Sequence, residues 1–98
     1  MALNLVEVSG RVEALEPMRM TPAGIPTRRF TIAHESRQLE AGMTRKVECR
    51  LRIVAIGEIA EQAGGFQDGL QVEVAGFLAK ASYRSEWPVV HATRLTVI

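Results

Sequence analysis

The sequence predicts an all-β protein, a five-stranded Greek-key OB-fold barrel with one short helix between strands 3 and 4. Three observations lead to this fold class. Five short segments of the 98-residue chain have strand patterns, a glycine stands in the middle of the first, and one helical segment lies near the centre of the chain. A seven-stranded sandwich would need more strands than the sequence offers, so the barrel is the better prediction.

Length and composition indicate a single OB-fold domain that spans residues 1–98. Apolar residues make up 47% of the chain and charged residues 23%, close to the averages of globular proteins, so the chain is expected to fold. There is no run of eighteen apolar residues, and the first residues lack the basic start and apolar block of a signal peptide. A cytoplasmic protein is expected.

The first strand is predicted over Leu3 to Leu15, because apolar and polar residues alternate there. Gly10 predicts a bulge or bend of the kind that a strand needs when it takes part in both halves of a small barrel. Thr21 to Pro26 predicts a tight turn, whose prolines lack N–H groups and are not expected to join a ladder. A second strand is expected from about Thr27 to Glu35, followed by a polar loop over Ser36 to Thr44.

The third strand has the clearest pattern. From Val47 to Ala55 the odd-numbered residues are apolar, while the even-numbered residues up to Arg52 are charged. This alternation predicts one face in the core and one charged face. Cys49 is the only cysteine, so no intrachain disulfide can form, and its place on the apolar side predicts a buried thiol.

The second half of the chain completes the barrel. One or two turns of helix are predicted over Gly57 to Ala63, where apolar residues recur at helical spacing. Asp68-Gly69 is a turn signal that leads into a fourth strand over Leu70 to Leu78. Lys80 to Trp87 breaks the alternation and predicts an exposed loop. In the last strand, Val89 to Ile98, the odd-numbered residues from 89 to 97 are predicted to share one side.

Signatures of catalysis and of metal binding are absent from the sequence. Asp68 is the only aspartate, and its expected role is to stabilise a turn. His34 and His91 stand in predicted strands with no cysteine or aspartate close in sequence, and one cysteine with two histidines cannot supply a structural zinc site. Nucleophile elbows, Walker loops and dinucleotide fingerprints are missing. We therefore expect a protein that is not an enzyme and that needs no cofactor.

Two interpretations of the Thr21 to Pro26 turn remain open at this stage. It is either an ordinary hairpin loop or the first hairpin of a nucleic-acid-binding barrel, with arginines placed where a phosphate backbone passes. The net charge of +1 decides little, but ten of the twelve cations are arginine, the side chain suited to forked contacts with phosphate. A bias in coding would explain the same excess.

Binding of single-stranded nucleic acid is the best-supported function. OB folds combine a positive groove with aromatic rings on which bases stack. The third strand supplies a charged face, and the Lys80 to Trp87 loop is expected to overhang it. Glu48 on that face supports the alternative of an ordinary solvated strand, and Trp87 could instead cap the core or sit in a dimer contact. The predicted nucleic-acid-binding residues are Arg19, Arg28, Arg45, Lys46, Arg50, Arg52, Lys80, Tyr83, Arg84 and Trp87.

Several motifs resemble the primosomal replication protein N (PriB) family, which is similar to bacterial single-stranded DNA-binding proteins. They are Val8-x-Gly10-x-Val12, Thr21-Pro22-Ala23-Gly24-Ile25-Pro26 with Phe30 and His34, Glu40-Ala41-Gly42, Val47-x-Cys49, Val74-x-Gly76-Phe77 and Val90-His91-Ala92. The resemblance implies an OB-fold homodimer that binds single-stranded DNA in replication restart, contacts the helicase PriA and the protein DnaT, and works at the bacterial nucleoid. By family analogy the dimer forms through the first strand, at Leu3, Leu5, Glu7, Ser9 and Arg11.

Single-stranded DNA-binding proteins proper share the turn but carry a Gly/Pro-rich tail with an acidic tip, whereas this sequence stops on its last strand at Ile98. That difference favours the primosomal family. Where these families place aromatic residues on the third strand, this chain has charged ones, so we expect arginine contacts with phosphate and stacking at the Tyr83 and Trp87 loop. Two alternatives stay open: a tail-less single-stranded DNA-binding protein, or an OB-fold protein-interaction module with little affinity for DNA.

Overall fold

Strand pairing closes the sheet of this protein into a barrel. The computed structural model describes all residues, 1–98, and the strand order is β1-β5-β6-β4-β3-β2, with an additional β1–β3 pairing that closes the ring. All neighbours are antiparallel except β4 and β6. The elements are β1 (Val6–Glu13), β2 (Arg19–Met20), β3 (Pro26–Glu40), β4 (Met43–Ile56), α1 (Glu58–Gln62), the 3-10 helix Ala63–Gly65, β5 (Gln71–Lys80) and β6 (Pro88–Val97). The predicted fold class is confirmed, with β2 added as a short extra strand.

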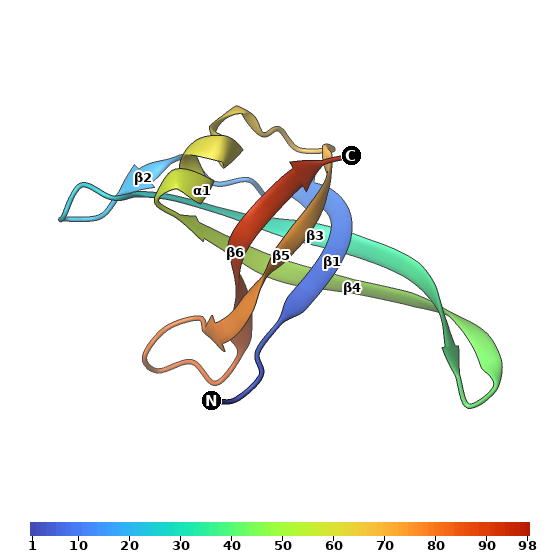
Figure 1. Cartoon of the computed structure of the whole chain (residues 1–98). Coiled ribbons are helices and arrows are strands. Elements are labelled where there is room, and N and C mark those ends of the chain that lie inside the picture. Colours follow the sequence, from blue (N-terminus) through green and yellow to red (C-terminus); the bar gives the residue numbers. More distant parts are fainter.

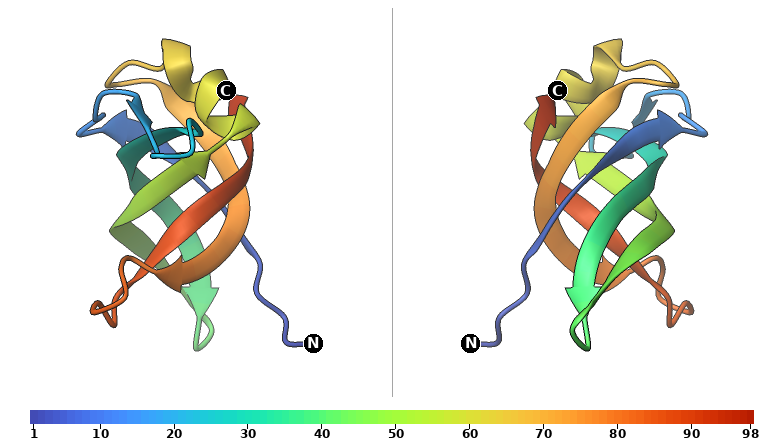
Figure 2. Two further views of the ribbon diagram at one scale, coloured as in Figure 1. Left: turned by 90° about the vertical axis from the view of Figure 1, so that its left-hand side faces the viewer. Right: turned by 90° about the vertical axis from the view of Figure 1, so that its right-hand side faces the viewer.

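The core lies inside the barrel and beneath the helix. Within the barrel, alternate residues of the five long strands point inward. Figures 1 and 2 show α1 covering one end of the barrel. Ala60 and Ala63 are fully buried at that end. Phe66 packs edge-to-face on Phe30 at 5.7 Å between ring centroids. The largest fully buried side chains are Val12, Ile32, Ile53, Val72, Val74 and Val90. No helix of the structure has the length and apolar character needed to cross a membrane.

Gly10 allows β1 to pair with two neighbouring strands, β5 and β3. Residues Val6–Arg11 pair with β5, and residues Arg11–Glu13 pair with β3. A Cβ at Gly10 would lie 2.6 Å from the carbonyl oxygen of Ala33, so only glycine permits this close approach. The predicted bend in the first strand is thus present. The strand itself is shorter than predicted, because the residues before Val6 are exposed and Ala14 follows with φ of 49°.

The Thr21 to Pro26 segment is the turn of the β2–β3 hairpin. Gly24 has φ of 78°, and the N–H of Thr21 donates to the carbonyl of Ile25 at 2.8 Å. The prediction that the prolines stay out of the ladder is wrong for Pro26, which begins β3 opposite Met20. Proline lacks only the N–H, and the carbonyl of Pro26 accepts a hydrogen bond from Gly57 at 2.9 Å.

The predicted loop over Ser36 to Thr44 is wrong, because β3 and β4 continue as a paired hairpin to its tip. Glu40 pairs with Met43, and the turn residues Ala41 and Gly42 have φ of 52° and 77°, as a two-residue hairpin turn requires. We call residues 35–48 the projecting hairpin, which extends well beyond the barrel in Figure 1. Its residues are exposed except for the half-buried Ser36 and Val47, so no alternation of apolar residues marks it as a strand pair.

Two further predictions fail for related reasons. Cys49 is exposed, because β4 has left the barrel at that point and its apolar side no longer meets the core. In β6 the predicted shared side is interrupted by a register shift: Ala75 pairs with Arg94 but Gly76 pairs with Ala92, leaving Thr93 as the extra residue. The β6 residues that pack into the core cluster are therefore Val90 and Ala92 before the extra residue and Leu95 after it.

Candidate nucleic-acid interface

The outer face of β3 and β4 carries three of the predicted cations, Lys46, Arg50 and Arg52. Directly opposite residues of antiparallel strands share a face, and Arg52 lies opposite Thr31 and Arg50 opposite Ala33. Arg29, opposite Val54, extends the same face by one more pair. The buried Phe30 and Ile32 alternate with these residues, so the arginines point away from the core.

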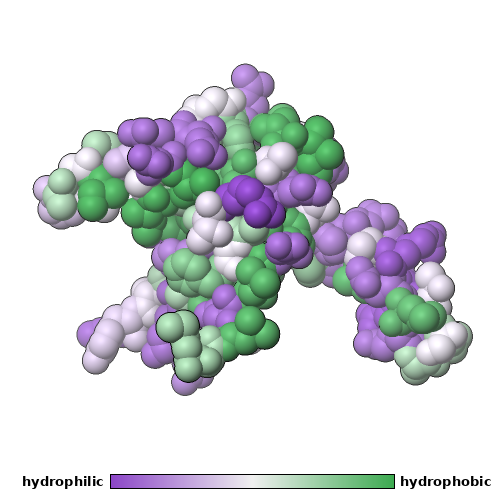
Figure 3. Space-filling view, viewed as in Figure 1, coloured by the Kyte–Doolittle hydropathy of each residue, from purple (hydrophilic) through white to green (hydrophobic).

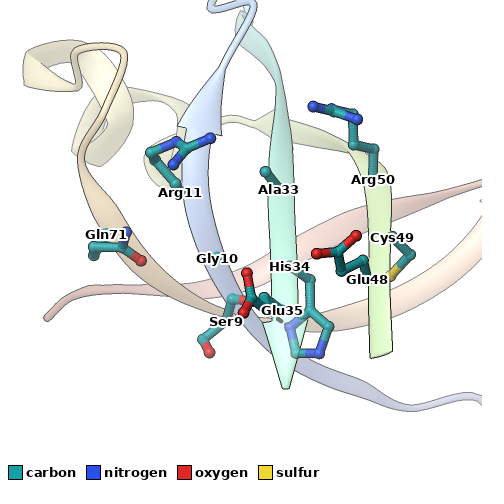
Figure 4. A pocket seen from close by; sticks show the side chains of 10 residues that line it. All are labelled: Ser9, Gly10, Arg11, Ala33, His34, Glu35, Glu48, Cys49, Arg50 and Gln71. Carbon is teal, nitrogen blue, oxygen red and sulfur yellow. Dashed lines mark hydrogen bonds between the residues drawn. The ribbon is translucent and has the colours of Figure 1, made fainter. Parts of the chain in front are cut away.

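β1 adds a third strand to this face. Arg11 pairs with Ala33, which in turn pairs with Arg50, so the three residues form one row across β1, β3 and β4. Figure 4 shows Arg11 and Arg50 on either side of the small Ala33. The next row is formed by Glu13, Thr31 and Arg52.

Glu13 holds two arginines from different strands. Arg11 Nη2 donates to Glu13 Oε1 at 2.9 Å, and Arg50 Nε donates to Glu13 Oε2 at 3.0 Å. The hydrogen bond from Arg11, followed by that from Arg50, lowers the pKa of Glu13 below its ordinary value. The carboxylate therefore stays ionised at neutral pH and offsets part of the positive charge of this face.

Cations of the projecting hairpin are also balanced locally. Lys46 Nζ lies 2.9 Å from Glu48 and 3.5 Å from Glu35. The hydrogen bond to Glu48, with the charge of Glu35 next in importance, raises the pKa of Lys46. Arg45 is paired with Glu40 at 2.9 Å. Figure 3 shows hydrophilic residues over much of this hairpin and hydrophobic ones near its tip. The ion pairs show that cations and carboxylates are interspersed there rather than forming one basic patch.

A cavity of about 530 Å³ joins the outer face to the β5–β6 loop. Arg29, Thr31 and Arg52 line it from the sheet, while Ser82 and Ser85 line it from the loop. Neither Arg29 nor Arg52 takes part in an ion pair of the structure, unlike Arg50. The loop thus overhangs the sheet where the unpaired arginines are, and this juxtaposition is the one that the sequence predicted for an OB barrel.

The β5–β6 loop presents aromatic rings to solvent. Tyr83 is 95% exposed and Trp87 81% exposed, so Trp87 does not cap the core. The loop is closed at its base, where Ala81 N donates to the carbonyl of Trp87 at 3.0 Å, and Ser85 Oγ accepts from Trp87 N at 3.2 Å. Exposed rings on a hydrogen-bonded loop are available for stacking on bases.

The structure separates the ten predicted residues into three sets. Lys46, Arg50 and Arg52 share the outer face, and Arg19 follows the same side on β2, opposite Thr27. The end of β5 contributes Lys80, and the β5–β6 loop contributes Tyr83, Arg84 and Trp87, all exposed. Arg28 and Arg45 are not brought to this face, because they lie opposite Ala55 and Gln38 on the other side of the sheet.

Arg28 also differs from the arginines of the outer face in its burial. Its Nε is buried and has no hydrogen-bond partner. Sequence reasoning named Arg28 but missed Arg29 and Arg37, which do lie on the outer face. The alternation of Phe30 and Ile32 with Thr31 contained the signal. It places residues 29, 31, 33, 35 and 37 on one side.

His34 fastens the projecting hairpin to β1. Its Nδ1 lies 2.7 Å from the carbonyl oxygen of Ser9 and its Nε2 lies 2.8 Å from Ser36 Oγ. Because a carbonyl can only accept, Nδ1 carries the proton in this arrangement. Both ring nitrogens are therefore used in structural hydrogen bonds. No group of three or more His, Cys, Asp or Glu side chains in the structure is placed to hold a metal ion.

The predicted dimer strand has one partly free edge. β1 pairs with β5 from Val6 to Arg11, whereas β3 pairs only with Arg11 to Glu13. Leu3 and Leu5, ahead of the strand, are 92% and 66% exposed. Arg11 differs from the other predicted dimer residues, Leu3, Leu5, Glu7 and Ser9, because its backbone is paired on both sides, with Gln71 and with Ala33.

Comparison with known proteins places this barrel among the single-strand binding proteins. A family model described as "another single-strand binding protein family" matches residues 4–94. The fold is also similar to that of the wild-type single-stranded DNA binding protein from Thermus aquaticus, with a TM-score of 0.79 and 25% identity over 98% of this chain and 50% of the other.

Similarity to replication restart proteins is stronger still. The chain is 37% identical to the replication restart protein PriB of Nitrosomonas europaea over 95 residues, which cover 97% of this chain and 88% of the relative. It is 40% identical to PriB of Bordetella pertussis over 79 residues, 81% of this chain and 74% of the relative. The PriB structure from Ralstonia solanacearum superposes with a TM-score of 0.87, at 27% identity over 99% of this chain and all of the other. The chain belongs to the PriB family of replication restart proteins.

Proposed function

We propose that this protein binds single-stranded DNA without sequence preference and links it to the restart helicase during replication restart. The observation that carries the proposal is the cavity between the outer face of β3 and β4 and the β5–β6 loop. There the unpaired Arg29 and Arg52 lie beneath a loop that bears Tyr83 and Trp87. Membership of a single-strand binding family supports the same function.

The chemistry of these residues explains why binding would not depend on sequence. Guanidinium groups contact phosphates, which every nucleotide carries, and aromatic rings stack on any base. A stacked base contributes about 1–3 kcal/mol. Each phosphate that an arginine neutralises releases counterions, so affinity falls as salt rises. Because Glu13, Glu35 and Glu48 lie among the cations, we expect modest affinity. Because the binding relies on arginine contacts with phosphate, we expect a steep dependence on salt.

Assembly and partners belong to the same proposal. The edge of β1 from Val6 to Gly10 that faces away from β5 is not paired with another strand, and a second copy could add its own β1 there. The exposed Leu3 and Leu5 would flank that contact. The helicase PriA and DnaT are the partners that family membership suggests. A sedimentation series over protein concentration tests the homodimer; a single monomer mass throughout would contradict it.

A second candidate function is a protein-interaction module with little DNA affinity. The projecting hairpin favours it, since its charges are mutually paired and its tip exposes Leu39 and Met43, at 75% and 72%. Such a mixed surface suits a protein partner better than a uniform polyanion.

Fluorescence anisotropy with labelled oligothymidine over a salt series separates the two candidates. Saturable binding that weakens with salt is expected for the wild type. Arg50→Ala with Arg52→Ala should weaken binding and flatten the salt slope, while the fold is retained by circular dichroism. Arg94→Ala, which removes a cation beside Glu7 on the β1–β5–β6 side, is the control and should change little. No saturable binding by the wild type at low salt would reject the DNA hypothesis in favour of the interaction module.

A further inference from the structure

Arg11, Ala33 and Arg50 line part of an open pocket on the outer face, which Glu35 and Glu48 also line and which we call the trough. The two arginines stand in one row, with only the methyl group of Ala33 between them, and Figure 4 shows both side chains extending from the strands on either side of it. Thr31 is the middle residue of the next row. Ala33 and Thr31, both on the middle strand β3, have small side chains. They leave room for an extended chain to lie across the sheet between the two guanidinium groups.

Most hydrogen-bond donors of these arginines remain available. A guanidinium group has five N–H donors, and Arg50 donates to Glu13 through Nε while Arg11 donates through Nη2. The side chain of Arg50 is 70% exposed and that of Arg11 53%, whereas that of Glu13 is 28% exposed. Solvent therefore reaches the guanidinium groups more readily than the carboxylate that holds them. Glu35 and Glu48 line the same pocket, and both are ion-paired with Lys46.

We propose that Arg11 and Arg50 form a subsite for one phosphate of a single-stranded nucleic acid and that Glu13, by holding both guanidinium groups, weakens that subsite. The proposal rests on the proposed DNA-binding function and deepens it. It extends the contact surface from β4 across β3 to β1. It also moves Arg11 from the predicted dimer contact to the DNA surface, which its doubly paired backbone supports.

Repulsion between the Glu13 carboxylate and a bound phosphate determines whether Glu13 strengthens or weakens binding. The carboxylate of Glu13 lies within 3.0 Å of a donor nitrogen on each arginine, so a phosphate bound by the same groups is brought close to a negative charge. Two unit charges about 4 Å apart in water repel by an amount equivalent to about fivefold in a binding constant. Neutralising Glu13 should therefore tighten binding, and removing Arg11 should weaken it.

The test uses Glu13→Gln and Arg11→Gln in the anisotropy titration with oligothymidine at low salt and over a salt series. Glu13→Gln keeps the shape and one acceptor oxygen of the side chain, and about fivefold tighter binding is expected. Arg11→Gln should weaken binding several-fold and flatten the slope of log K against log salt by about 0.7, the value for one phosphate on a single strand. Glu61→Gln on α1 and Arg94→Gln on β6 are the controls with matched charge changes.

The outcomes keep this inference separate from the proposed function. If the wild type does not bind oligothymidine, the proposed function fails as a whole. If the wild type binds but Glu13→Gln matches Glu61→Gln and Arg11→Gln matches Arg94→Gln, the subsite is wrong and the wider function stands. If Arg11→Gln instead changes the mass in sedimentation, Arg11 belongs to a subunit contact and the inference is overturned. Circular dichroism and a thermal melt establish that each variant is folded, and either variant alone can decide the question.

Discussion

The barrel and the projecting hairpin are made from the same two strands but are stabilised differently. Within the barrel, β3 buries Phe30 and Ile32 on its inner side, so burial of apolar surface adds to the backbone ladder. Beyond His34 the same strand has water on both faces and is held by its ladder with β4 and by exposed ion pairs. Exposed ion pairs contribute little, because water and salt screen the two charges. A continuous strand pair thus has a rigid half and a weakly held half, and the DNA surface proposed here lies mainly on the rigid half.

The largest contrast is expected between Ile32→Ala and Leu39→Ala, two substitutions on one strand. Ile32 is fully buried, and its truncation leaves a cavity that should lower the free energy of unfolding by about 2–5 kcal/mol. Leu39 is 75% exposed, and its truncation should change the free energy by less than about 0.5 kcal/mol. Urea denaturation followed by circular dichroism measures both. Equal losses would show that the hairpin has a core of its own.

Gly10→Ala tests the crossing of β1 over Ala33. The added methyl group would lie 2.6 Å from the carbonyl oxygen of Ala33, which is fixed in the ladder, so destabilisation of about 1–3 kcal/mol is expected. Gly65→Ala is the control, because no heavy atom lies within 4 Å of its added Cβ. Denaturation midpoints compare the two. A Gly10→Ala variant as stable as Gly65→Ala would mean that β1 does not make this close approach.

Ala41→Asn should affect only the hairpin. Ala41 has φ of 52° before Gly42, and asparagine adopts positive φ more readily than alanine in a two-residue turn. Slower amide hydrogen exchange is expected around the turn, by up to about 1 kcal/mol in opening free energy, with no change in the barrel. Hydrogen exchange followed by NMR gives both values. Equal slowing in barrel and hairpin would show that the two regions open together.

The smallest effect concerns Lys46. Its pKa is raised above the ordinary 10.5, chiefly by Glu48, so the ion pair stabilises the fold below pH 10.5 and this contribution is lost as pH rises through the raised value. Glu48→Gln should bring the titration of the Lys46 ε-methylene, followed by NMR, back toward its ordinary pKa. Glu35→Gln should lower it less. An unchanged midpoint in Glu48→Gln would show that the pair does not persist in solution.

The same contrast explains what the sequence could predict. Inward residues of the barrel recur at every second position, and this pattern predicts the five long strands. Apolar residues at helical spacing predict the helix, and Gly10 predicts the bend. The sequence predicts a loop in place of the projecting hairpin, because strands that are exposed to solvent on both faces show no alternation of apolar and polar residues. Cys49 looked buried because the apolar alternation of its strand continues beyond the point where the core ends.

Which residues belong to the candidate site depends on strand register, and register is difficult to predict from a sequence. Arg28 and Arg29 are adjacent, and a shift of one residue exchanges the outer face for the inner one. The row from Arg11 to Arg50 joins residues 39 positions apart along the chain and could be found only from strand pairing. In β6 the bulge at Thr93 breaks the alternation, and the glycine that accompanies it, Gly76, lies on the partner strand β5 rather than in β6.

The most direct test of the DNA surface is an NMR titration of the isotope-labelled protein with oligothymidine at low salt. Backbone amide shifts should change along Arg29 to Ala33, Arg50 to Arg52 and the β5–β6 loop, while Glu73 and Thr96 on the β5–β6 side stay unchanged. Shift changes confined to the β5–β6 side, or to the tip of the projecting hairpin, would contradict the proposed location of the DNA-binding site.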